Sequence, residues 1–249
     1  MPGLNTRKVL VIAPHQDDEV LACGGTIIKR IREGHSVSIV FLTDGRRGCG
    51  DGKYADPEDI KSIRHLEAIN ATRSLGVPVE NIYFLDFHDG NLKEKGFEVK
   101  KKLLDLLSAI QPDEIFMPGH KDFHPDHSFT NKSVLSVVKV AKITADIYEY
   151  IIWDKDTEKR PDKTLLKYNA AENVRDVLDL KKRALFEYKC QTTIFFPTQK
   201  KPLMSNDFLG RYLKEIEHFV KYRIVKGKIK KLNWFVAFFA NLMRRPDLK

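Results

Sequence analysis

The acidic sequence His-Gln-Asp-Asp-Glu at residues 15–19 constrains this chain more than any other feature, because it directly follows the apolar run of residues 8–14. A β-branched run that ends in a proline is typical of a buried strand. Apolar residues at helical spacing follow, so the charged residues lie where a strand turns into a helix. Open α/β sheets bind their ligands at that edge. The sequence therefore predicts an α/β protein with a polar site next to its first strand.

Strand and helix patterns alternate along most of the chain. The predicted strands cover residues 8–14, 36–43, 81–87, 114–118 and 147–152. The predicted helices cover residues 18–32, 57–75, 97–110, 128–143, 177–190 and 206–225. This alternation favours a Rossmann-like parallel sheet with helices on both faces. We expect Gly24 and Gly25 to let the first helix approach the sheet closely. We expect one domain over residues 1–204, and a helical, basic and aromatic C-terminal extension over residues 205–249 that packs on the domain or flanks it.

Length and composition exclude several classes of protein. The chain has 249 residues, 42% of them hydrophobic, which is enough for a sizeable core, so we do not expect a disordered protein. Only six apolar or small residues stand between Lys8 and His15, too few for a signal peptide, and we expect a cytoplasmic protein. The three cysteines, Cys23, Cys49 and Cys190, fit neither a disulfide framework nor a CxxC zinc ribbon, and we expect free thiols.

The formal net charge of +9 and the isoelectric point of about 9.3 raise the question of a polyanionic partner. Much of the excess lies in the tail, where basic residues flank the aromatic run at residues 234–243. This run is shorter than the roughly 20 apolar residues needed to span a bilayer. Two interpretations stay open: a terminal helix that packs on the domain, and a peripheral helix on an anionic membrane surface. We do not expect nucleic acid as a partner, and a homo-oligomer stays open.

Two short motifs together indicate a metal site. His15 and Asp18 are three residues apart at one strand-to-helix turn and can converge on one cation, but a catalytic zinc site usually has three protein ligands and an open position for water. The sequence His-Pro-Asp-His at residues 124–127 follows the predicted fourth strand and supplies the missing ligand. Helix capping would explain Asp17 or Asp18, but neither His15 nor the distant histidines. Spacing alone does not decide which of the two aspartates binds the metal.

Together, the two motifs resemble those of the PIG-L/LmbE superfamily of metal-dependent N-deacetylases, whose members deacetylate N-acetylglucosaminyl lipids and the sugar precursors of mycothiol and bacillithiol. The first motif has Gln16 where the family usually has a proline. Similar segments follow at residues 43–45, 64–67, 75–76 and 184–191. The resemblance covers approximately residues 8–191, and we expect the predicted domain to be a deacetylase domain.

The resemblance implies a zinc site and a base. It assigns His15, Asp18 and His127 as zinc ligands and Asp17 as the general base. Another divalent metal such as Fe²⁺ stays open. The chemistry agrees, because zinc activates water at neutral pH and a nearby carboxylate can take the water's proton.

Further residues are expected to act on the substrate. His124, if protonated, would stabilise the oxyanion or give a proton to the amine, with Asp126 orienting it or keeping it charged. Arg64, Asp89 and Arg46 are candidates for binding sugar hydroxyls or an anionic group, although each also has an ordinary structural interpretation.

Two residues close to the second motif, His120 and Asp122, are expected to shape the pocket without binding the metal.

The predicted function is a zinc hydrolase that removes the acetyl group from an N-acetylated amino sugar or its conjugate, including lipid- or nucleotide-linked ones. One alternative is an amidase of a sugar-thiol conjugate. The alternative from another class is a membrane-surface or nucleic-acid adaptor that acts through the basic tail. Nucleotide binding as the main role is disfavoured, because neither GxGxxG nor GxxxxGK[ST] occurs.

Overall fold

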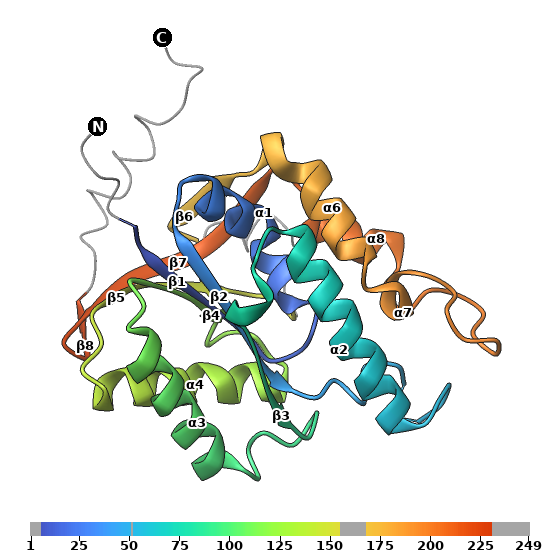
Figure 1. The fold of residues 1–249 in the computed structure, drawn as a ribbon, viewed down its shortest axis with the longest axis horizontal. Helices are drawn as coiled ribbons and strands as arrows, with labels where there is room; N and C mark the ends of the chain where they lie inside the picture. The colour runs from blue at the N-terminus through green and yellow to red at the C-terminus, as the bar shows by residue number, and fades with distance from the viewer. Residues whose placement is uncertain (1–5, 51, 155–167, 231–249) are drawn as a thin grey trace.

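The computed structural model describes residues 6–50, 52–154 and 168–230, and within them eight strands form one sheet of order β3-β2-β1-β4-β5-β7-β6, with β8 beside β7 (Figure 1). The strands are β1 (Lys8–Ala13), β2 (Ser36–Thr43), β3 (Ile82–Phe87), β4 (Glu114–Pro118), β5 (Ala145–Tyr150), β6 (Ala170–Asn173), β7 (Ile216–Val225) and β8 (Lys228–Lys230). The helices are α1 (Asp18–Arg32), α2 (Pro57–Ser74), α3 (Gly96–Ile110), α4 (Pro125–Val140), α6 (Leu178–Phe186), α7 (Lys189–Thr192) and α8 (Asn206–Tyr212). Short 3₁₀ turns lie at Val79–Asn81 and Arg175–Val177.

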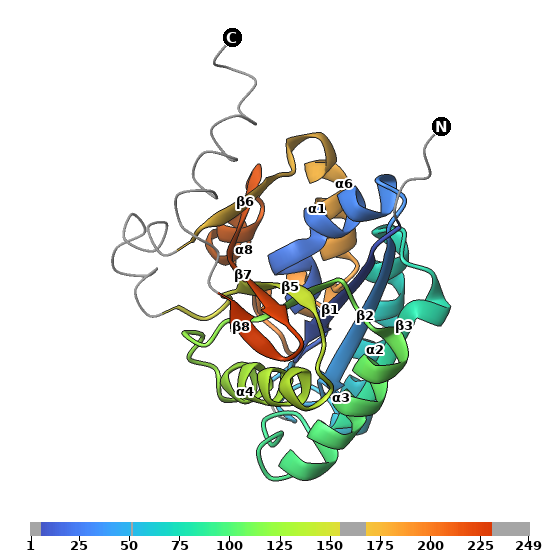
Figure 2. The ribbon, with the colours of Figure 1, turned by 90° about the vertical axis from the view of Figure 1, so that its left-hand side faces the viewer.

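Helices cover both faces of the sheet, with α3 and α4 on one side and α1, α2 and α6 on the other (Figures 1 and 2). Alternate residues of β1 serve the two cores: Val9 and Val11 pack on the side of α1, and Leu10 and Ile12 pack on the side of α3 and α4. A strand buried on both faces reads as a continuous apolar run, which explains the pattern seen in the sequence. The neighbouring strands β3, β2, β1, β4 and β5 all pair in parallel, so the predicted α/β architecture is confirmed.

The structure corrects the start of α4. The sequence predicted a loop that continued to His127, whereas α4 begins at Pro125 with His124 as its N-cap residue. Proline suits the first helical position because its missing N–H would have no intrahelical partner there. The second motif therefore lies on the first turn of a helix, and His127 has a rigid backbone.

The predicted helix over residues 206–225 is wrong beyond Tyr212. Ile216–Val225 is strand β7, which pairs antiparallel with β5 on one side and with β6 on the other. The run is rich in β-branched and aromatic residues. Lys226 and Gly227, with φ of 48° and 74°, close a two-residue hairpin to β8. The expected helical extension thus contains one short helix, α8, followed by two strands of the sheet up to residue 230, and its aromatic run at residues 234–243 lies outside the described residues.

Gly24 and Gly25 do allow a close approach, but to different neighbours than expected. A Cβ on Gly25 would lie 2.5 Å from Val174 Cβ, and one on Gly24 would lie 3.0 Å from Lys181 Cγ. The glycines therefore let α1 pack against α6 and the segment after β6. None of the helices in the described part of the chain is long and apolar enough to cross a bilayer.

Candidate metal centre

The two motifs meet because β1 and β4 are neighbours in the sheet and run in parallel. The turn between β1 and α1 carries the first motif, and the segment between β4 and α4 leads into the second. Carboxyl ends of parallel strands lie at the same edge, and ligands of open α/β sheets bind there. The structure thus brings together the residues that the sequence predicted as one site.

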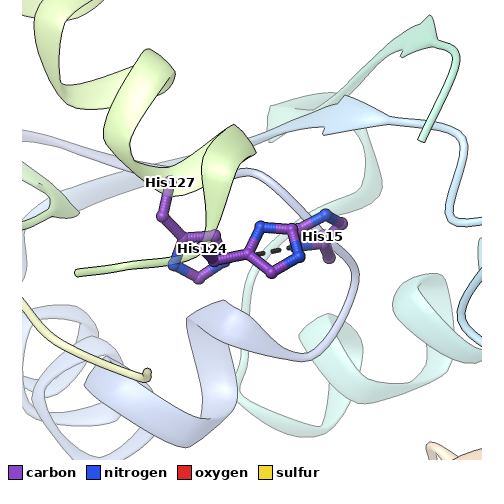
Figure 3. A group of neighbouring side chains, drawn as sticks. All are labelled: His15, His124 and His127. Carbon is purple, nitrogen blue, oxygen red and sulfur yellow. Dashed lines mark hydrogen bonds between the residues drawn. The ribbon is translucent and has the colours of Figure 1, made fainter. Parts of the chain in front are cut away.

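Three atoms converge at this edge. His15 Nδ1 lies 3.2 Å from His127 Nε2. Asp18 Oδ2 lies 3.4 Å from His15 Nδ1 and 3.2 Å from His127 Nε2. His124 approaches the same point, and its ring centroid is 4.8 Å from that of His15 and 5.0 Å from that of His127. Figure 3 shows the three imidazoles gathered beside the first turn of α4.

The outer nitrogens of both central histidines face carboxylates. His127 Nδ1 is 3.0 Å from Asp122 Oδ2. His15 Nε2 is 3.2 Å from Asp89 Oδ1 and 3.4 Å from Asp126 Oδ2. A carboxylate accepts the N–H and so fixes the tautomer of the ring, as partners of metal-binding histidines usually do. The inner nitrogens, His15 Nδ1 and His127 Nε2, then face one another, and in the neutral rings each has a lone pair that a metal would use.

The charges around the cluster favour a cation. Burial alone would lower the pKa of His15, but the carboxylates of Asp126, Asp18 and Asp89 raise it well above its ordinary value. Against the same effect of burial, Asp18 and Asp122 raise the pKa of His127 to about 9. Burial by itself would raise the pKa of Asp18, and the two histidines instead lower it far below its usual range. A positive charge is therefore stabilised at this point of the structure.

The donor set fits a small divalent metal. Tetrahedral zinc with bonds of about 2.0–2.1 Å places its ligand atoms about 3.3 Å apart, and the three converging atoms are separated by 3.2 to 3.4 Å. Two imidazole nitrogens and one carboxylate oxygen are ligands that catalytic zinc sites use. In addition, His124 Nδ1 is buried without a hydrogen-bond partner among the described residues. The site can hold a metal through His15, Asp18 and His127 and still has His124 beside it.

Asp17 lies next to this cluster in a strained backbone conformation. Its φ is 125°, a region that residues other than glycine rarely adopt. Arg64, only 2% exposed, holds the residue in place, because its Nη2 donates to Asp17 Oδ2 at 2.8 Å and to the carbonyl of Gln16. The Asp17 N–H donates to Glu19 Oε2 at 3.0 Å. Burial raises the pKa of Asp17 to about 7, with Asp18 adding to the effect and Arg64 opposing it.

The structure gives different surroundings to other predicted site residues. Asp126 faces His15 rather than His124, and it also accepts the backbone N–H of Gly90 at 2.8 Å. Asp89 faces His15 as well. The guanidinium of Arg46 pairs with Asp44 at 2.6 Å and with a glutamate on α2, so it does not line the cavity described next. Burial and the nearby histidines lower the pKa of His124.

A cavity of about 760 Å³ opens over the cluster. Its lining includes the predicted residues His15, Asp17, Asp18, Arg64, Asp89 and His124, together with Arg47, Phe123, Trp153, Phe208 and Arg211. The aromatic residues of this lining were not predicted as site residues from the sequence. Trp153 could have been found, because it stands just beyond the predicted strand over residues 147–152 and so at the same edge of the sheet.

Further residues that were not predicted as site residues hold Asp17 and its neighbours in place. Tyr188 Oη donates to Glu19 Oε1 at 2.5 Å, and Glu19 in turn accepts from the backbone of Asp17. Gln16, which replaces the usual proline, donates from Nε2 to the carbonyl of Thr43 at 2.8 Å and so ties the end of β1 to the end of β2. Glu67 accepts from the backbone and thiol of Cys190. Glu67 and Tyr188 lie in segments that resemble those of the family, but the sequence alone did not indicate which residues they contact.

Fold and site together define a class: Rossmann-like α/β proteins with a candidate metal centre of two histidines and one aspartate at the carboxyl edge of the sheet. The family model described as PIG-L, GlcNAc-PI de-N-acetylase, matches residues 10–138, just over half of the chain. The chain therefore belongs to the PIG-L family, and the predicted enzyme class, an N-deacetylase, is confirmed.

Individual relatives agree with the family. A probable N-acetyl-α-D-glucosaminyl L-malate deacetylase 2 of Bacillus cereus is 28% identical over 223 residues, which cover 87% of this chain and 98% of that protein. The diacetylchitobiose deacetylase of Thermococcus kodakarensis is 34% identical over 51% of this chain, and the match spans 47% of that protein. The solved structure of N,N'-diacetylchitobiose deacetylase from Pyrococcus horikoshii superimposes with a TM-score of 0.67 at 25% identity, covering 90% of this chain and 85% of that one.

Proposed function

We propose that this chain hydrolyses the N-acetyl group of an N-acetylated amino sugar or its conjugate, with zinc held by His15, Asp18 and His127. The observation that carries the proposal is the convergence of two imidazole nitrogens and one carboxylate oxygen within 3.4 Å in a buried setting. Atoms of this kind stay so close only where a positive charge lies among them, and a divalent metal would supply that charge in place of the protons of the histidines. Relatives named for N-acetylglucosaminyl malate and diacetylchitobiose support an N-acetylglucosamine unit in the substrate.

The residues around the metal have separate roles in this reaction. Bound zinc would supply a Lewis acid for the amide carbonyl and lower the pKa of water to about 7. Asp17 would take the proton of the attacking water at its carboxylate, and a pKa of about 7 suits a base at neutral pH. Arg64 would keep that carboxylate in place, because its own guanidinium is fixed by two contacts.

His124 would act on the oxygen that becomes negatively charged. The sequence assigned this role to His124 if the imidazole is protonated, and the lowered pKa of His124 favours the neutral ring. A neutral imidazole still donates one N–H to an oxyanion, as neutral histidines do in other active sites. Asp126 and Asp89 would act indirectly, because both hold His15.

Metal removal and reloading test the proposal. We expect chelator-treated protein to release no acetate from N-acetylglucosamine glycosides, and protein reloaded with Zn²⁺ to release it. Parallel reloading with Fe²⁺ shows which metal supports turnover. Sugar-thiol conjugates carrying a bulkier amide belong in the same panel: cleavage of these alone would favour the amidase alternative. Absence of acetate release from every N-acetylated sugar by metal-loaded protein would overturn the proposal.

A second part of the proposal concerns where the enzyme works. The basic residues that flank the aromatic run at residues 234–243 support binding to an anionic membrane surface. Flotation with vesicles of phosphatidylcholine, with and without phosphatidylserine, tests this, and a chain ending at residue 230 is the control. Equal flotation of both chains, or none with anionic vesicles, would contradict it.

A further inference from the structure

The cavity over the metal centre has an aromatic wall on one side. Trp153 follows β5, and Phe208 belongs to α8; their ring centroids are 5.4 Å apart. Trp153 lies beside the catalytic cluster, since its ring centroid is 6.4 Å from that of His124. Both rings line the cavity, and Trp153 remains 38% exposed. We call Trp153 and Phe208 the aromatic wall.

The aromatic wall is held in register with the metal centre by one carboxylate. Asp122 Oδ2 contacts His127 Nδ1 at 3.0 Å and also accepts the backbone N–H of Ile152 at 2.9 Å and of Trp153 at 3.1 Å. Phe123, one residue on from Asp122, donates its N–H to the carbonyl of Trp153 at 3.1 Å. The distance between Trp153 and the metal ligands is therefore fixed by a short path of hydrogen bonds.

Helix α8 is fixed to the same strand end. Tyr212 Oη donates to the carbonyl of Ile152 at 2.5 Å, and the Tyr212 ring packs against Phe208 at a centroid distance of 5.2 Å. Ser205 caps the helix by accepting the N–H of Phe208 at 3.1 Å. Two large rings are thus kept rigid while part of their apolar surface faces a cavity. Rigid apolar surface next to a reactive centre is a feature of ligand pockets.

The size of the cavity leaves room for more than the reacting sugar. Its volume of about 760 Å³ lies in the upper part of the range of pockets that enclose drug-sized ligands, about 300–1,000 Å³. The acetamide must reach His15 and Asp17, so the rest of the substrate extends toward other parts of the lining. Trp153 is near the reacting group, because its ring centroid is 6.4 Å from that of His124, which lies beside the metal ligands.

We propose that the aromatic wall of Trp153 and Phe208 is a subsite for the group attached to the amino sugar, and that this group is a ring with an apolar face, either a second pyranose or an aromatic ring. The inference rests on the proposed deacetylation. Flat rings gain from stacking on aromatic side chains, whereas a short open-chain group offers no matching face. Trp153 and Phe208 are then specificity-determining residues, because the ring contacts them while the acetamide reacts elsewhere.

Two glycosides that differ only in the attached group test this subsite. The 4-nitrophenyl and methyl glycosides of N-acetylglucosamine share the reacting sugar. We expect kcat/KM of Trp153→Ala and of Phe208→Ala to fall about tenfold for the 4-nitrophenyl glycoside and less than twofold for the methyl glycoside. Trp153→Phe, which keeps a ring, should recover most of the loss. Phe97→Ala removes a ring that is 80% exposed on α3 and should change neither value. N,N'-diacetylchitobiose in place of the 4-nitrophenyl glycoside tests a pyranose.

Binding without turnover separates this inference from the proposed reaction. Titration calorimetry with zinc-loaded Asp17→Asn should show tighter binding of the 4-nitrophenyl glycoside than of the methyl glycoside, and the difference should disappear in Asp17→Asn/Trp153→Ala. Equal affinities for the two glycosides, or an equal loss of kcat/KM for both in Trp153→Ala, would overturn the subsite. If ring-dependent binding is present but no acetate is released by the unmodified enzyme, the subsite stands and the proposed reaction fails.

Discussion

At the carboxyl edge of the sheet, His15, Asp18 and His127 direct three polar atoms at one another, whereas under α1 the buried pair Lys181 and Glu217 is surrounded by partners. Glu217 Oε1 accepts from Lys181 Nζ at 2.7 Å and from the backbone N–H of Gly25 at 2.9 Å. Its Oε2 accepts from the backbone and hydroxyl of Thr26. Lys181 also donates to the carbonyl of Leu21 at 2.9 Å.

The difference between the two regions teaches how to interpret buried charge in this molecule. A buried ion pair that is fully hydrogen-bonded holds α1, α6 and β7 together and needs no ligand. At the edge of the sheet the carboxylates take the outer N–H groups of the histidines, and two inner nitrogens and one carboxylate oxygen converge on one point at 3.2 to 3.4 Å, where a positive charge is stabilised. A buried charge with a complete set of hydrogen bonds thus indicates a structural role, and nitrogen and carboxylate atoms that converge on one point indicate a ligand site.

Two further buried acids are stabilised in a third way, by keeping a proton. Burial raises the pKa of Glu19 to about 8, and Tyr188 bonds to its carboxyl group. Burial, with the adjacent thiol of Cys190, raises the pKa of Glu67 to about 8. Neither residue has a metal-binding partner among the clusters found in the described chain. Acids in one protein thus differ in whether a cation, an ammonium group or a proton neutralises them.

The largest expected effect is at the edge of the sheet. Asp17→Asn should lower kcat for deacetylation about a thousandfold, because the amide cannot accept the water's proton, while metal content stays unchanged. Acetate release and metal per chain are the measurements, with the exposed Asp105→Asn as control. Full activity in a metal-loaded Asp17→Asn protein would show that Asp17 is not the base.

Breaking the buried pair should affect stability instead. Lys181→Met leaves Glu217 buried without its counter-charge, and we expect the free energy of unfolding to fall by about 3 kcal/mol or more, with kcat of the remaining folded enzyme unchanged. Lys182→Met, on a side chain that is 42% exposed, is the matched control. Denaturant unfolding measures the loss. Adding Glu217→Gln should recover part of the lost stability, since a neutral amide needs no counter-charge. If Lys181→Met lowers kcat but leaves the free energy of unfolding unchanged, the pair has a role in activity and not in stability.

A smaller effect is expected from the carboxylate that links the metal centre to the aromatic wall. Asp122→Asn should weaken metal binding about 10- to 100-fold, because the amide orients His127 less well. Competition with a chromogenic chelator measures the affinity, and Asp105→Asn is again the control. Unchanged affinity would argue against His127 Nε2 as a metal ligand.

The smallest effect concerns the protonated acids. The folded state keeps a proton on Glu67 that the unfolded chain releases above its ordinary pKa of 4.5, so stability should fall as the pH rises from about 5 to about 8. Glu67→Gln should reduce this fall by on the order of 1 kcal/mol. Thermal unfolding across that range tests it, with the exposed Glu98→Gln as control. The same pH dependence in Glu67→Gln and the parent protein would mean that Glu67 is ionised in the folded state.

Much of the fold followed from local sequence patterns. The apolar run before His15 and the helical spacing after Asp18 predicted β1 and α1 correctly, because periodicity within one element reflects which faces are buried. Both motifs were also visible in the sequence, since each lies in one short segment. The prediction failed where a local pattern had two interpretations: residues 216–225 carry basic and apolar residues that suited a helix, and only the pairing with β5 and β6 made them a strand.

What the sequence by itself determined is the α/β class, the two motifs and their position after strands. The tertiary structure alone decided which partners those residues have. Asp122 holds both His127 and Trp153, Asp126 faces His15 instead of His124, and Glu217 meets Lys181. Asp122 meets Trp153 because β4 and β5 are neighbours, and Glu217 meets Lys181 because α1 packs closely against α6, whereas Asp122 and His127 are only five residues apart. Such long-range neighbours are set by the arrangement of whole elements in space, and no short stretch of the chain encodes them on its own.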